Sequence, residues 1–388
     1  MEFSLSEEQH NLRAAVRSLC RTFPGSYWRD LDRERGYPQQ FVDGLTASGY
    51  LSALIPTAYG GLGLGVTEAS IILEEINRSG GHSAACHAQM YIMGALAKHG
   101  SEAQRQRWLP QIASGAKRLQ AFSVTEPEAG SDTTAIQTMA ARDGDGYMVN
   151  GFKNWTSRIE HSDLLMLLAR TSPNDETSDR TRGLSLFLVD LEDARRQRAI
   201  EVAPVRTMFN YETFQVAYRD LRIPADSLIG EEGMGFRYVI DGWNAERILL
   251  AAECVGDGYW FVEKASSYAT GREVFGRPIG QNQGVQFPIA RAYAQLRAAD
   301  LLRYQAAWLF DRGEKCGAEA NMAKLLASEA SWAAANACLD TFGGNGFVDE
   351  YDVERKFRET RLFQTAPINN NLVLAYVATH VLGMPKSY

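Results

Sequence analysis

The stretch AFSVTEPEAGSD, residues 121–132, lies where the chain changes its hydrophobic pattern. Before it, up to about Lys117, apolar residues recur at the 3.6-residue period of amphipathic helices. After it, to about residue 225, short segments rich in β-branched and aromatic residues alternate with turn signals. From Gly233 onward the helical period returns and continues to the last residues. This order predicts a mainly α-helical protein with a central antiparallel β-domain.

The pattern divides the chain into three expected domains. The first is α-helical, and Ser4 with Glu7 three residues later predicts the capped start of its first helix. In the second, DGDGY at 143–147 predicts a hairpin turn between two strands. The third contains long helical segments with short connections, which predict an antiparallel four-helix bundle. The expected domain limits are 1–118, 119–228 and 229–388, with bundle helices at 236–270, 284–313, 317–342 and 371–382.

The composition argues against several classes of function. With 45% hydrophobic and 22% charged residues, the chain is typical of a globular protein. A net charge of −7 argues against a nucleic-acid partner, and the longest apolar runs, such as LLMLLA, are too short to span a membrane. The first residues lack the features of a signal peptide. Five scattered cysteines and six histidines without ligand spacing predict no metal site and reduced thiols, as in a cytoplasmic protein.

Two segments of the predicted β-domain carry residues suited to a nucleotide. In 121–132, hydroxyls and bare backbone amides at a strand end suit the edge of a flat heterocycle and a phosphate. A polar turn capped by Asp132 explains the same residues equally well. KNWTS at 153–157 adds two hydroxyls and Trp155, an aromatic residue that more often belongs to a core. The residues alone leave both interpretations open.

Two later segments have the same character. Arg272 lies in GREVFGRPIGQNQGVQ, 271–286, and its guanidinium suits a pyrophosphate. DTFGGNGF, 340–347, ends a helix in glycines, which let a ligand approach the backbone. Neither segment is decisive alone, but the four segments in this order resemble the acyl-CoA dehydrogenase family.

The resemblance covers essentially the whole chain. TEPEAGSD is similar to the family signature TEPxAGSD, and RILLAAECVG, YATGREVFGRPI and FGGNGF with EYDVERKFRE agree with it. The resemblance implies an α-helical domain, a β-domain and a C-terminal four-helix bundle, in a homotetramer or dimer with non-covalent FAD. It implies α,β-dehydrogenation of an acyl thioester of CoA or of an acyl-carrier protein, with electron-transfer flavoprotein as the usual acceptor. Flavin-dependent monooxygenases and acyl-CoA oxidases on the same fold are the alternative.

The resemblance also implies which residues bind FAD. Those expected near the flavin are Phe122, Val124, Thr125, Ser131, Trp155, Thr156 and Ser157. The adenosine half of the FAD in a neighbouring subunit is expected to contact Arg272, Phe275 and Gln283. Asp340, Gly343 and Gly344 are expected near the FAD diphosphate, and Asn369 and Asn371 of the last loop are also expected to bind FAD. Asp340 stands where many members have Gln, and its carboxylate would repel phosphate unless it turns away.

The catalytic base is the main departure from the family pattern. Most members carry it as a Glu in the last loop, but RLFQTAPINNN at 361–371 contains no acid, and the matching residue is Pro367. A branch that includes isovaleryl-CoA dehydrogenase places the Glu on a bundle helix, directly before an Arg. Glu246 precedes Arg247 at the matching position, so we expect Glu246 to be the base. A surface ion pair of these two residues is the simpler interpretation.

The remaining expectations concern the substrate. Ser131, Asn244 and Arg247 are expected to contact it. Pro367 lacks the backbone N–H that donates to the thioester oxygen in the family. The amide of Ile368 takes over, the carbonyl is held differently, or the reaction does not need this donor, and the sequence leaves all three open. The acyl pocket is expected to be lined from the helix at 84–95 and around 363–366, with Ala85, Gln89, Met90 and Met93 in its wall.

Overall fold

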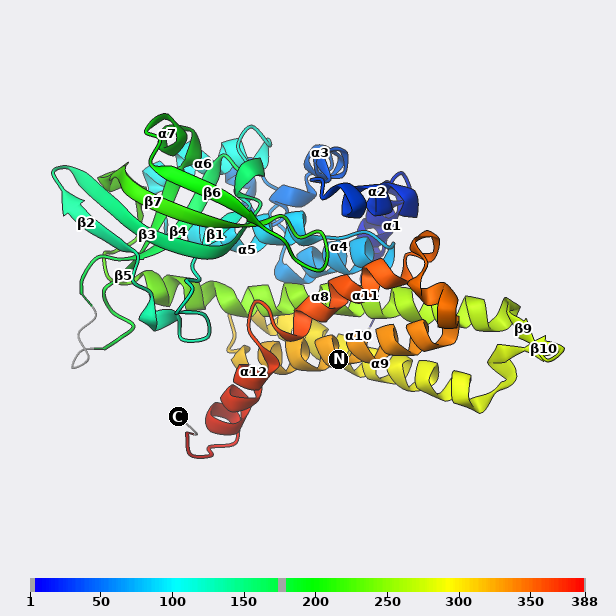
Figure 1. The fold of residues 1–388 in the computed structure, drawn as a ribbon. Coiled ribbons are helices and arrows are strands. Elements are labelled where there is room, and N and C mark those ends of the chain that lie inside the picture. Colours follow the sequence, from blue (N-terminus) through cyan, green and yellow to red (C-terminus); the bar gives the residue numbers. More distant parts are fainter. Residues whose placement is uncertain (1–3, 174–178, 387–388) are drawn as a thin grey trace.

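The chain folds into two helical regions with a β-domain between them in sequence, as Figure 1 shows. The computed structural model describes residues 4–173 and 179–386. This is the predicted architecture, and the prediction is confirmed. The first region contains α1 (Glu7–Cys20), α2 (Gly25–Glu34), α3 (Gln39–Ala47), α4 (Val66–Arg78), α5 (Ala84–His99) and α6 (Glu102–Ala113).

The start of α1 differs from the sequence prediction. The N-cap is Ser6, whose Oγ accepts from the Gln9 amide at 3.2 Å, and the Gln9 side chain accepts from the Ser6 amide at 3.1 Å. Ser4 with Glu7 as the capping pair is therefore wrong by two residues. Glu7 and Glu8 instead occupy the first helical turn, where negative charge is favourable next to the helix dipole.

The β-domain is one eight-stranded sheet with the order β6-β7-β3-β2-β4-β5-β8, and β1 pairs with β4. Asp143 pairs with Gly146, which confirms the predicted hairpin. Most pairings are antiparallel, but β1 and β2 both run parallel to β4, which the sequence did not predict. The strands are β1 (Ala121–Ser123), β2 (Met139–Asp143), β3 (Gly146–Ser157), β4 (Leu164–Arg170), β5 (Leu184–Asp190), β6 (Ile200–Val205), β7 (Thr213–Pro224) and β8 (Leu228–Ile229), with α7 (Leu191–Arg196) after β5.

The C-terminal region is built on three long helices. These are α8 (Gly235–Gly271), α9 (Gln283–Asp311) and α10 (Gly317–Phe342), close to the predicted limits. A short hairpin of β9 (Glu273–Val274) and β10 (Arg277–Pro278) joins α8 to α9. The last predicted helix is shorter than expected, because α12 (Asn370–Tyr376) continues as a π-helical turn, Val377–Val381. An additional helix, α11 (Val353–Arg361), packs on α10.

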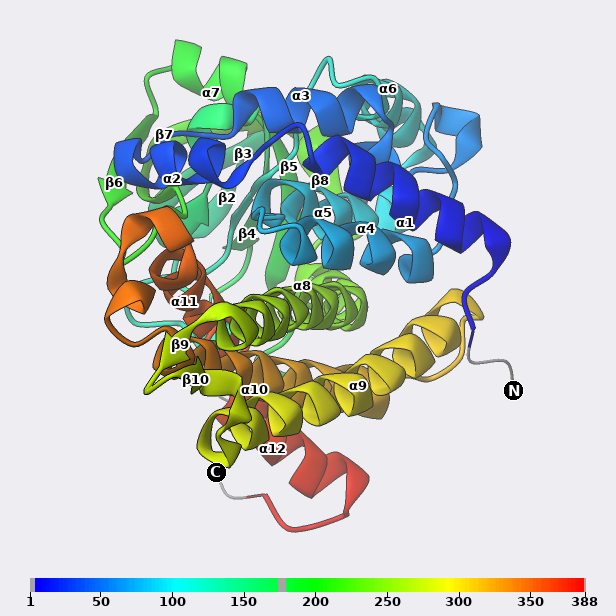
Figure 2. The same ribbon diagram turned by 90° about the vertical axis from the view of Figure 1, so that its right-hand side faces the viewer.

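Helix α8 lies in the middle of the molecule. Figure 2 shows it between α4 and α5 on one side and α9 and α10 on the other. Glycines allow this close packing, because an added Cβ at Gly256 would collide with the Glu74 carbonyl oxygen and one at Gly258 with Leu296 of α9. Side chains on α8 are therefore held by packing from two sides. Among the described residues, no helix is long and apolar enough to cross a membrane.

Candidate active site

The loop after β1 is fixed by a buried carboxylate. Glu126 accepts from the backbone amides of Gln137 at 2.6 Å and Thr138 at 2.9 Å. The fully buried Lys153 lies 2.9 Å from Glu126 Oε1 and donates to the Val124 carbonyl at 2.8 Å. Burial lowers the pKa of Lys153 to about 8, although Glu126 opposes this shift. Sequence analysis missed this clamp, which holds the strand ends that present Val124 and Thr125.

At the end of β3, the side chains of three adjacent residues lie in different environments. Trp155 has φ of 60° and a side chain 55% exposed, so the simpler interpretation of it as a core residue is wrong. Ser157 is partly buried and its hydroxyl donates to Thr213 at 3.2 Å. Thr156 is fully buried, and its hydroxyl lies 2.9 Å from that of Ser123 inside the β-domain. The Thr156 hydroxyl is therefore not free for the expected flavin contact, because the register shift between Lys153 and Thr156, where Trp155 has a positive φ, turns that side chain inward.

The last loop of the chain lies beside the loop after β1. Asn369 Nδ2 donates to Ser131 Oγ at 3.1 Å, and the Asn369 carbonyl caps α12. The ammonium of Lys324 on α10 donates to the Ile368 carbonyl and to Asn370 Oδ1, both at 2.7 Å. Pro367 is exposed in this loop, and Asn371 is exposed on α12. The loop is thus well anchored, but it presents no carboxylate.

Glu246 is a buried carboxylate without a partner. It lies on α8, is 7% exposed, and makes no hydrogen bond or ion pair with any described residue. Burial raises its pKa, while the charges of His87 and Arg247 oppose that shift. The surface ion pair with Arg247 is therefore wrong, since neither residue is on the surface and no such pair forms. An unpaired buried acid is rare in folded proteins and requires an explanation.

Arg247 has spare hydrogen-bonding capacity as well. It is 8% exposed, its Nε has no partner among the described residues, and its guanidinium lies 5.5 Å from the Trp243 ring centroid. Burial lowers its pKa, which Glu246 opposes. Asn244, one turn earlier on α8, is partly buried beside Gly317 at the start of α10. One stretch of α8 therefore presents an unpaired acceptor and an unpaired donor.

A small cavity of about 20 Å³ lies where α5, α8 and the β-domain meet. It is lined by Tyr91, Ile92, Ala95, Phe122, Met166, Tyr238, Val239, Gly242 and Trp243. The predicted helix α5 contributes to this cavity, but through Tyr91, Ile92 and Ala95 and not through the four residues expected. Ala85 and Met90 pack in the N-terminal core, Gln89 donates to the Leu51 carbonyl, and Met93 packs in a separate core cluster. Phe363 is buried in the bundle core, so the segment around 363–366 does not line this cavity either.

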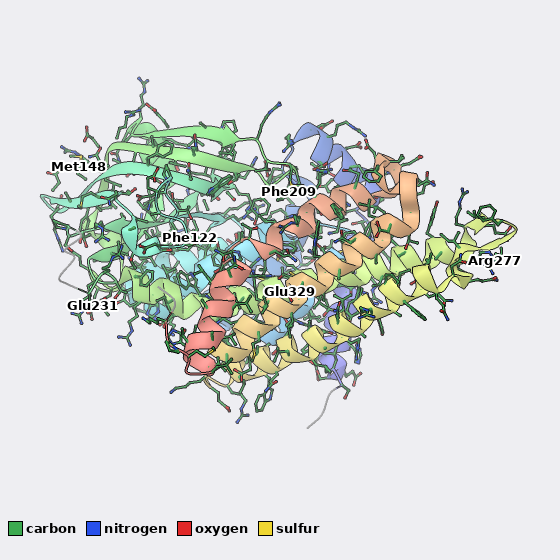
Figure 3. All side chains as sticks on the ribbon, turned by 60° about the horizontal axis from the view of Figure 1, so that its bottom comes forward. Phe122, Met148, Phe209, Glu231, Arg277 and Glu329 are labelled. Carbon is green, nitrogen blue, oxygen red and sulfur yellow. The ribbon has the colours of Figure 1, made fainter. Side chains whose placement is uncertain are left out.

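The residues expected to hold the adenosine half lie at the far end of the bundle. Phe275 is fully exposed at the tip between β9 and β10, and Arg272 and Gln283 flank it in the sequence and are exposed. Figures 1 and 3 show this hairpin, with Arg277 labelled, at the opposite end of the molecule from the β-domain and Phe122. The two sets of predicted residues therefore cannot bind one FAD within one chain.

The diphosphate candidates lie with the adenosine candidates. Asp340, Gly343 and Gly344 are exposed at the end of α10, and Asn345 donates to Tyr268 near the end of α8 at 2.8 Å. A Cβ added at either glycine would meet nothing within 4 Å, so the backbone there is open to a ligand. At the other end of the molecule, in the β-domain, the exposed Trp155 side chain can stack on a flat ring. These residues fit FAD shared between two subunits.

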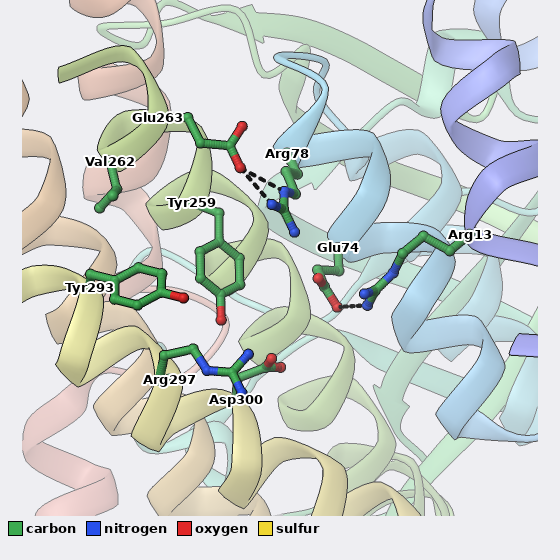
Figure 4. A pocket seen from close by; sticks show the side chains of 9 residues that line it. All are labelled: Arg13, Glu74, Arg78, Tyr259, Val262, Glu263, Tyr293, Arg297 and Asp300. Atoms are coloured by element: carbon green, nitrogen blue, oxygen red, sulfur yellow. Dashed lines mark hydrogen bonds and ion pairs between the residues drawn. The ribbon is translucent and has the colours of Figure 1, made fainter. Parts of the chain in front are cut away.

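A larger cavity, about 150 Å³, lies between α1, α4, α8 and α9 and does not add to this site (Figure 4). Its three arginines and three acids balance in charge. They form ion pairs with one another, such as Arg13 with Glu74 at 2.8 Å. No group of His, Cys, Asp or Glu within 4–173 and 179–386 could hold a metal ion.

The fold and site define a three-domain flavoprotein dehydrogenase. Family models for the acyl-CoA dehydrogenase N-terminal, middle and C-terminal domains match residues 6–116, 121–217 and 233–380. The acyl-CoA dehydrogenase fadE12 of Mycobacterium bovis is 35% identical, with 100% of this chain and 99% of the relative covered. The chain belongs to the acyl-CoA dehydrogenase family. It is an FAD-dependent oxidoreductase that acts on the CH–CH bond of acyl-CoA.

Two solved structures match over nearly their full length. A glutaryl-coenzyme A dehydrogenase in complex with glutaryl-CoA has a TM-score of 0.91 and 30% identity, covering 100% of this chain and 98% of that one. A structure described as the electron transferring flavoprotein of Acidaminococcus fermentans has a TM-score of 0.91 and 27% identity, covering 98% of this chain and 100% of that one. Neither comparison identifies the catalytic base of this chain.

Proposed function

We propose that Glu246 is the base that removes the α-proton of the acyl-CoA substrate. The observation that carries this is its buried carboxylate, which no described residue pairs. The proposal places the chain in the branch that carries the base on a bundle helix, as isovaleryl-CoA dehydrogenase does. The last loop supports it, because Pro367 occupies the alternative position and has no proton-accepting group.

The chain's own residues account for the proton chemistry. Burial raises the pKa of Glu246 above that of a solvated carboxylate, which makes the ionised form a stronger base. Arg247 and His87 limit that rise, so the carboxylate stays ionised at a lower pH than burial alone would allow. When bound, FAD supplies the acceptor for the hydride that leaves the β-carbon. Arg247, with Nε unpaired, is positioned to interact with charge that develops on the thioester.

The proposal also assigns residues to the flavin and to the acyl-CoA substrate. Val124, Thr125, Ser131, Trp155 and Ser157 would hold the flavin, and Ser131 with Asn244 and Arg247 would contact the substrate. Phe122 lines the small cavity, which would take the acyl chain. Its aromatic and apolar lining suits a hydrocarbon chain.

Substitution of Glu246 by Gln tests the base directly. The amide keeps the size of the side chain but cannot accept the proton, so flavin bleaching by acyl-CoA should slow by about 10²- to 10⁴-fold. The measurement is anaerobic mixing of FAD-loaded enzyme with straight and branched saturated acyl-CoAs, followed at the oxidised flavin band. Unchanged FAD content is the control for folding. Bleaching by the variant at the wild-type rate would contradict the proposal.

The same titration separates the rival activities. Bleaching by an acyl-CoA in the absence of oxygen supports the dehydrogenase over a monooxygenase, which would need a reductant such as NADH. A preference for an acyl-carrier-protein thioester would show as bleaching by that substrate alone. Product formation with oxygen as the only acceptor would support an acyl-CoA oxidase. A buried unpaired base favours the dehydrogenase, because hydroxylation of an amine or a sulfur compound needs no α-proton removal.

We also propose a homo-oligomer in which the hairpin of one subunit completes the FAD site of another. Phe275 is 100% exposed, and Phe287, Leu301 and Trp308 on α9 are about half exposed, which is a large apolar surface for a monomer. A tetramer or dimer would cover it. Light scattering of the FAD-loaded protein should give a multiple of 43.0 kDa, and an FAD-loaded monomer would contradict the proposal.

Electron-transfer flavoprotein is the acceptor that we propose, in line with the neighbour from Acidaminococcus fermentans. Rapid reoxidation of the substrate-reduced enzyme by that protein would support it, and reoxidation by oxygen alone would not. The domain limits 1–118, 119–228 and 229–388 and the cytoplasmic location stay predictions. All five cysteines are buried and unpaired, which agrees with a reducing compartment.

A further inference from the structure

His87 and Glu253 form a buried pair of ionisable groups near Glu246. His87 on α5 is 7% exposed, and its Nδ1 lies 3.1 Å from Glu253 Oε1 on α8. The Ser83 hydroxyl donates to the same oxygen at 2.7 Å. With Nδ1 occupied by Glu253, the Nε2 of His87 remains, and it is buried without a hydrogen-bond partner in the described part of the chain. An orphaned ring nitrogen in the interior suggests a transient partner.

Helix geometry places this pair on the side of α8 that carries the base. Glu246 and Glu253 are seven residues apart, so they share one face of α8 at about 10 Å along its axis. His87 projects from α5, which packs on that face. It is also the opposing charge that acts most strongly on Glu246. The His87 ring lies 5.3 Å from the ring of Tyr91, which lines the acyl cavity.

On the other side of the pair is a cavity of about 40 Å³ with polar walls. His82, next to Ser83 in the chain, lines it together with Arg158 and Tyr211. Asp32 and Glu212 also line it and are 17% and 12% exposed, so the cavity communicates with the surface. The volume exceeds that of a single water molecule. His82 lines the cavity and also acts on the charge of Glu253, so the pair lies near the cavity although neither His87 nor Glu253 lines it.

We propose that His87 and Glu253 form a proton relay that carries the α-proton from Glu246 toward the cavity at His82. The relay rests on the proposed role of Glu246 as the base. Glu246 takes the proton as the α-carbon–hydrogen bond breaks. The structure shows no hydrogen bond between the described residues Glu246 and His87, so the Glu246 side chain turns to bring its O–H to Nε2 of neutral His87. As Nε2 takes this proton, the Nδ1–H of His87 passes its proton to the Glu253 carboxylate. Glu253 does not line the cavity itself, so a bridging water takes the proton from Glu253 to the cavity, and no electrons move in these steps.

Turnover requires Glu246 to release the proton that it takes from the substrate, and the relay provides a path for it. A base that is 7% exposed cannot exchange its proton freely with bulk water, least of all with substrate over it. The charged and titratable neighbours of Glu246 are His87 and Tyr91 from α5, Arg247 and Glu253 from α8, and Tyr211 from the segment before β7. Burial would raise the pKa of Glu253, but His87 and the Ser83 hydroxyl lower it, so Glu253 is a carboxylate that can accept a proton.

Solvent exchange of the α-proton measures the relay apart from flavin reduction. The ligand is a CoA thioester with α-hydrogens and no β-hydrogens, such as 3,3-dimethylbutyryl-CoA, bound to the FAD-loaded enzyme in D₂O. No hydride can leave this ligand, so deuterium enters only when Glu246 exchanges its proton with solvent. In His87→Gln the amide can still bond Glu253 but cannot pass a proton. Exchange should fall by about 10-fold or more, while single-turnover flavin reduction by a normal substrate, measured at high pH where Glu246 is ionised in both enzymes, changes by less than about threefold.

Further variants cover a failure of folding and supply a control. Glu253→Gln should have the same effect as His87→Gln, and it replaces that variant if His87→Gln does not retain FAD. His99→Gln is the matched control, because His99 also lies on α5 and contacts a carboxylate, Asp241 at 3.1 Å. That variant should exchange at the wild-type rate.

The outcomes separate the relay from the base. Wild-type exchange in both His87→Gln and Glu253→Gln would overturn the relay, and so would an equal loss of exchange and flavin reduction. Glu246→Gln should lose both activities. If Glu246→Gln retains both, the proposed base is wrong. If it loses both while the relay variants are unaffected, the base stands and the relay does not.

Discussion

Two regions compete for the catalytic acid in this fold, and they differ in rigidity as well as in sequence. Glu246 lies on α8, a helix of 37 residues packed from two sides, and is 7% exposed. The loop around Pro367 is exposed and is held mainly by the hydrogen bonds of Lys324 and by the contact between Asn369 and Ser131. Both regions border the same junction, because Arg247 and Lys324 lie close enough to influence each other's charge.

The comparison shows that the position of an acid in the chain and the environment it needs are separate requirements. A general base here needs a buried carboxylate that faces the cleft, and either region can supply the backbone for it. A helix fixes the side chain by packing, which gives a more precise position than a loop. With Glu246 as the proposed base on α8, the loop can carry Pro367, which has neither an acid nor an N–H.

Moving the acid from α8 to the loop is the strongest test of this comparison. We expect Glu246→Gln combined with Pro367→Glu to recover about 10-fold of the flavin reduction that Glu246→Gln alone loses, because the new carboxylate restores a proton acceptor. Stopped-flow reduction by the preferred acyl-CoA measures it. Pro367→Gln in the Glu246→Gln background is the control for loop changes. Recovery with Gln as well as Glu would show that the loop backbone, not the carboxylate, is responsible.

The charge next to the base gives a second, smaller effect. Flavin reduction should rise with pH as Glu246 ionises, and Arg247 lowers its pKa. Removing that charge in Arg247→Gln raises the pKa of Glu246 and moves the acidic limb of the profile to higher pH. Rates on that limb, at saturating substrate, should fall by about 3- to 10-fold and recover at high pH. Arg247→Lys should keep the wild-type limb, and a uniform loss at every pH would contradict the electrostatic role.

The sequence predicted the architecture, because helical periodicity and ordered motifs carry it, and it also pointed to Glu246, whose role as the base stays a proposal. The C-terminal loop without acid and the Glu–Arg pair on a helix were visible in the residue order alone. Which way each side chain faces was less predictable. Thr156 and Ser157 are adjacent hydroxyls, and only the pairing of β3 with β7 shows that Thr156 faces inward.

Helix α5 shows why the residues that line the small cavity could not be chosen from the sequence. Most of its residues are buried, including Ala85, Gln89, Met90 and Met93, so no amphipathic stripe marks the side that faces the cleft. The cavity is lined instead by Tyr91, Ile92 and Ala95. Glu126 with Lys153, and His87 with Glu253, were missed for a related reason. Each pair joins elements far apart in the chain, and sequence spacing within one element gives no signal for it.

Lys324 anchors the loop around Pro367, and its removal should affect the loop without affecting Glu246 on α8. Lys324→Met keeps an unbranched side chain but leaves the Ile368 carbonyl without its donor and Asn370 with one fewer. We expect it to lower the free energy of unfolding by about 1–3 kcal/mol, measured by urea unfolding of the FAD-loaded enzyme. Lys315→Met, at an exposed lysine before α10, is the control and should have little effect. Glu246 sits on a separate helix, so flavin reduction should change much less than in Glu246→Gln.

The stability lost in Lys324→Met should depend on pH in a defined direction. Burial lowers the pKa of Lys324 from its usual 10.5 to about 8, so between these values the unfolded chain binds more protons than the folded one. Wild-type stability must then rise with pH in this window, while the Met variant lacks that contribution. The gap between wild type and variant should therefore widen from about pH 8 to about pH 10. A constant or narrowing gap would mean that the Lys324 ammonium is not buried in the folded enzyme, and the loop would then be held by Asn369 and Ser131 alone.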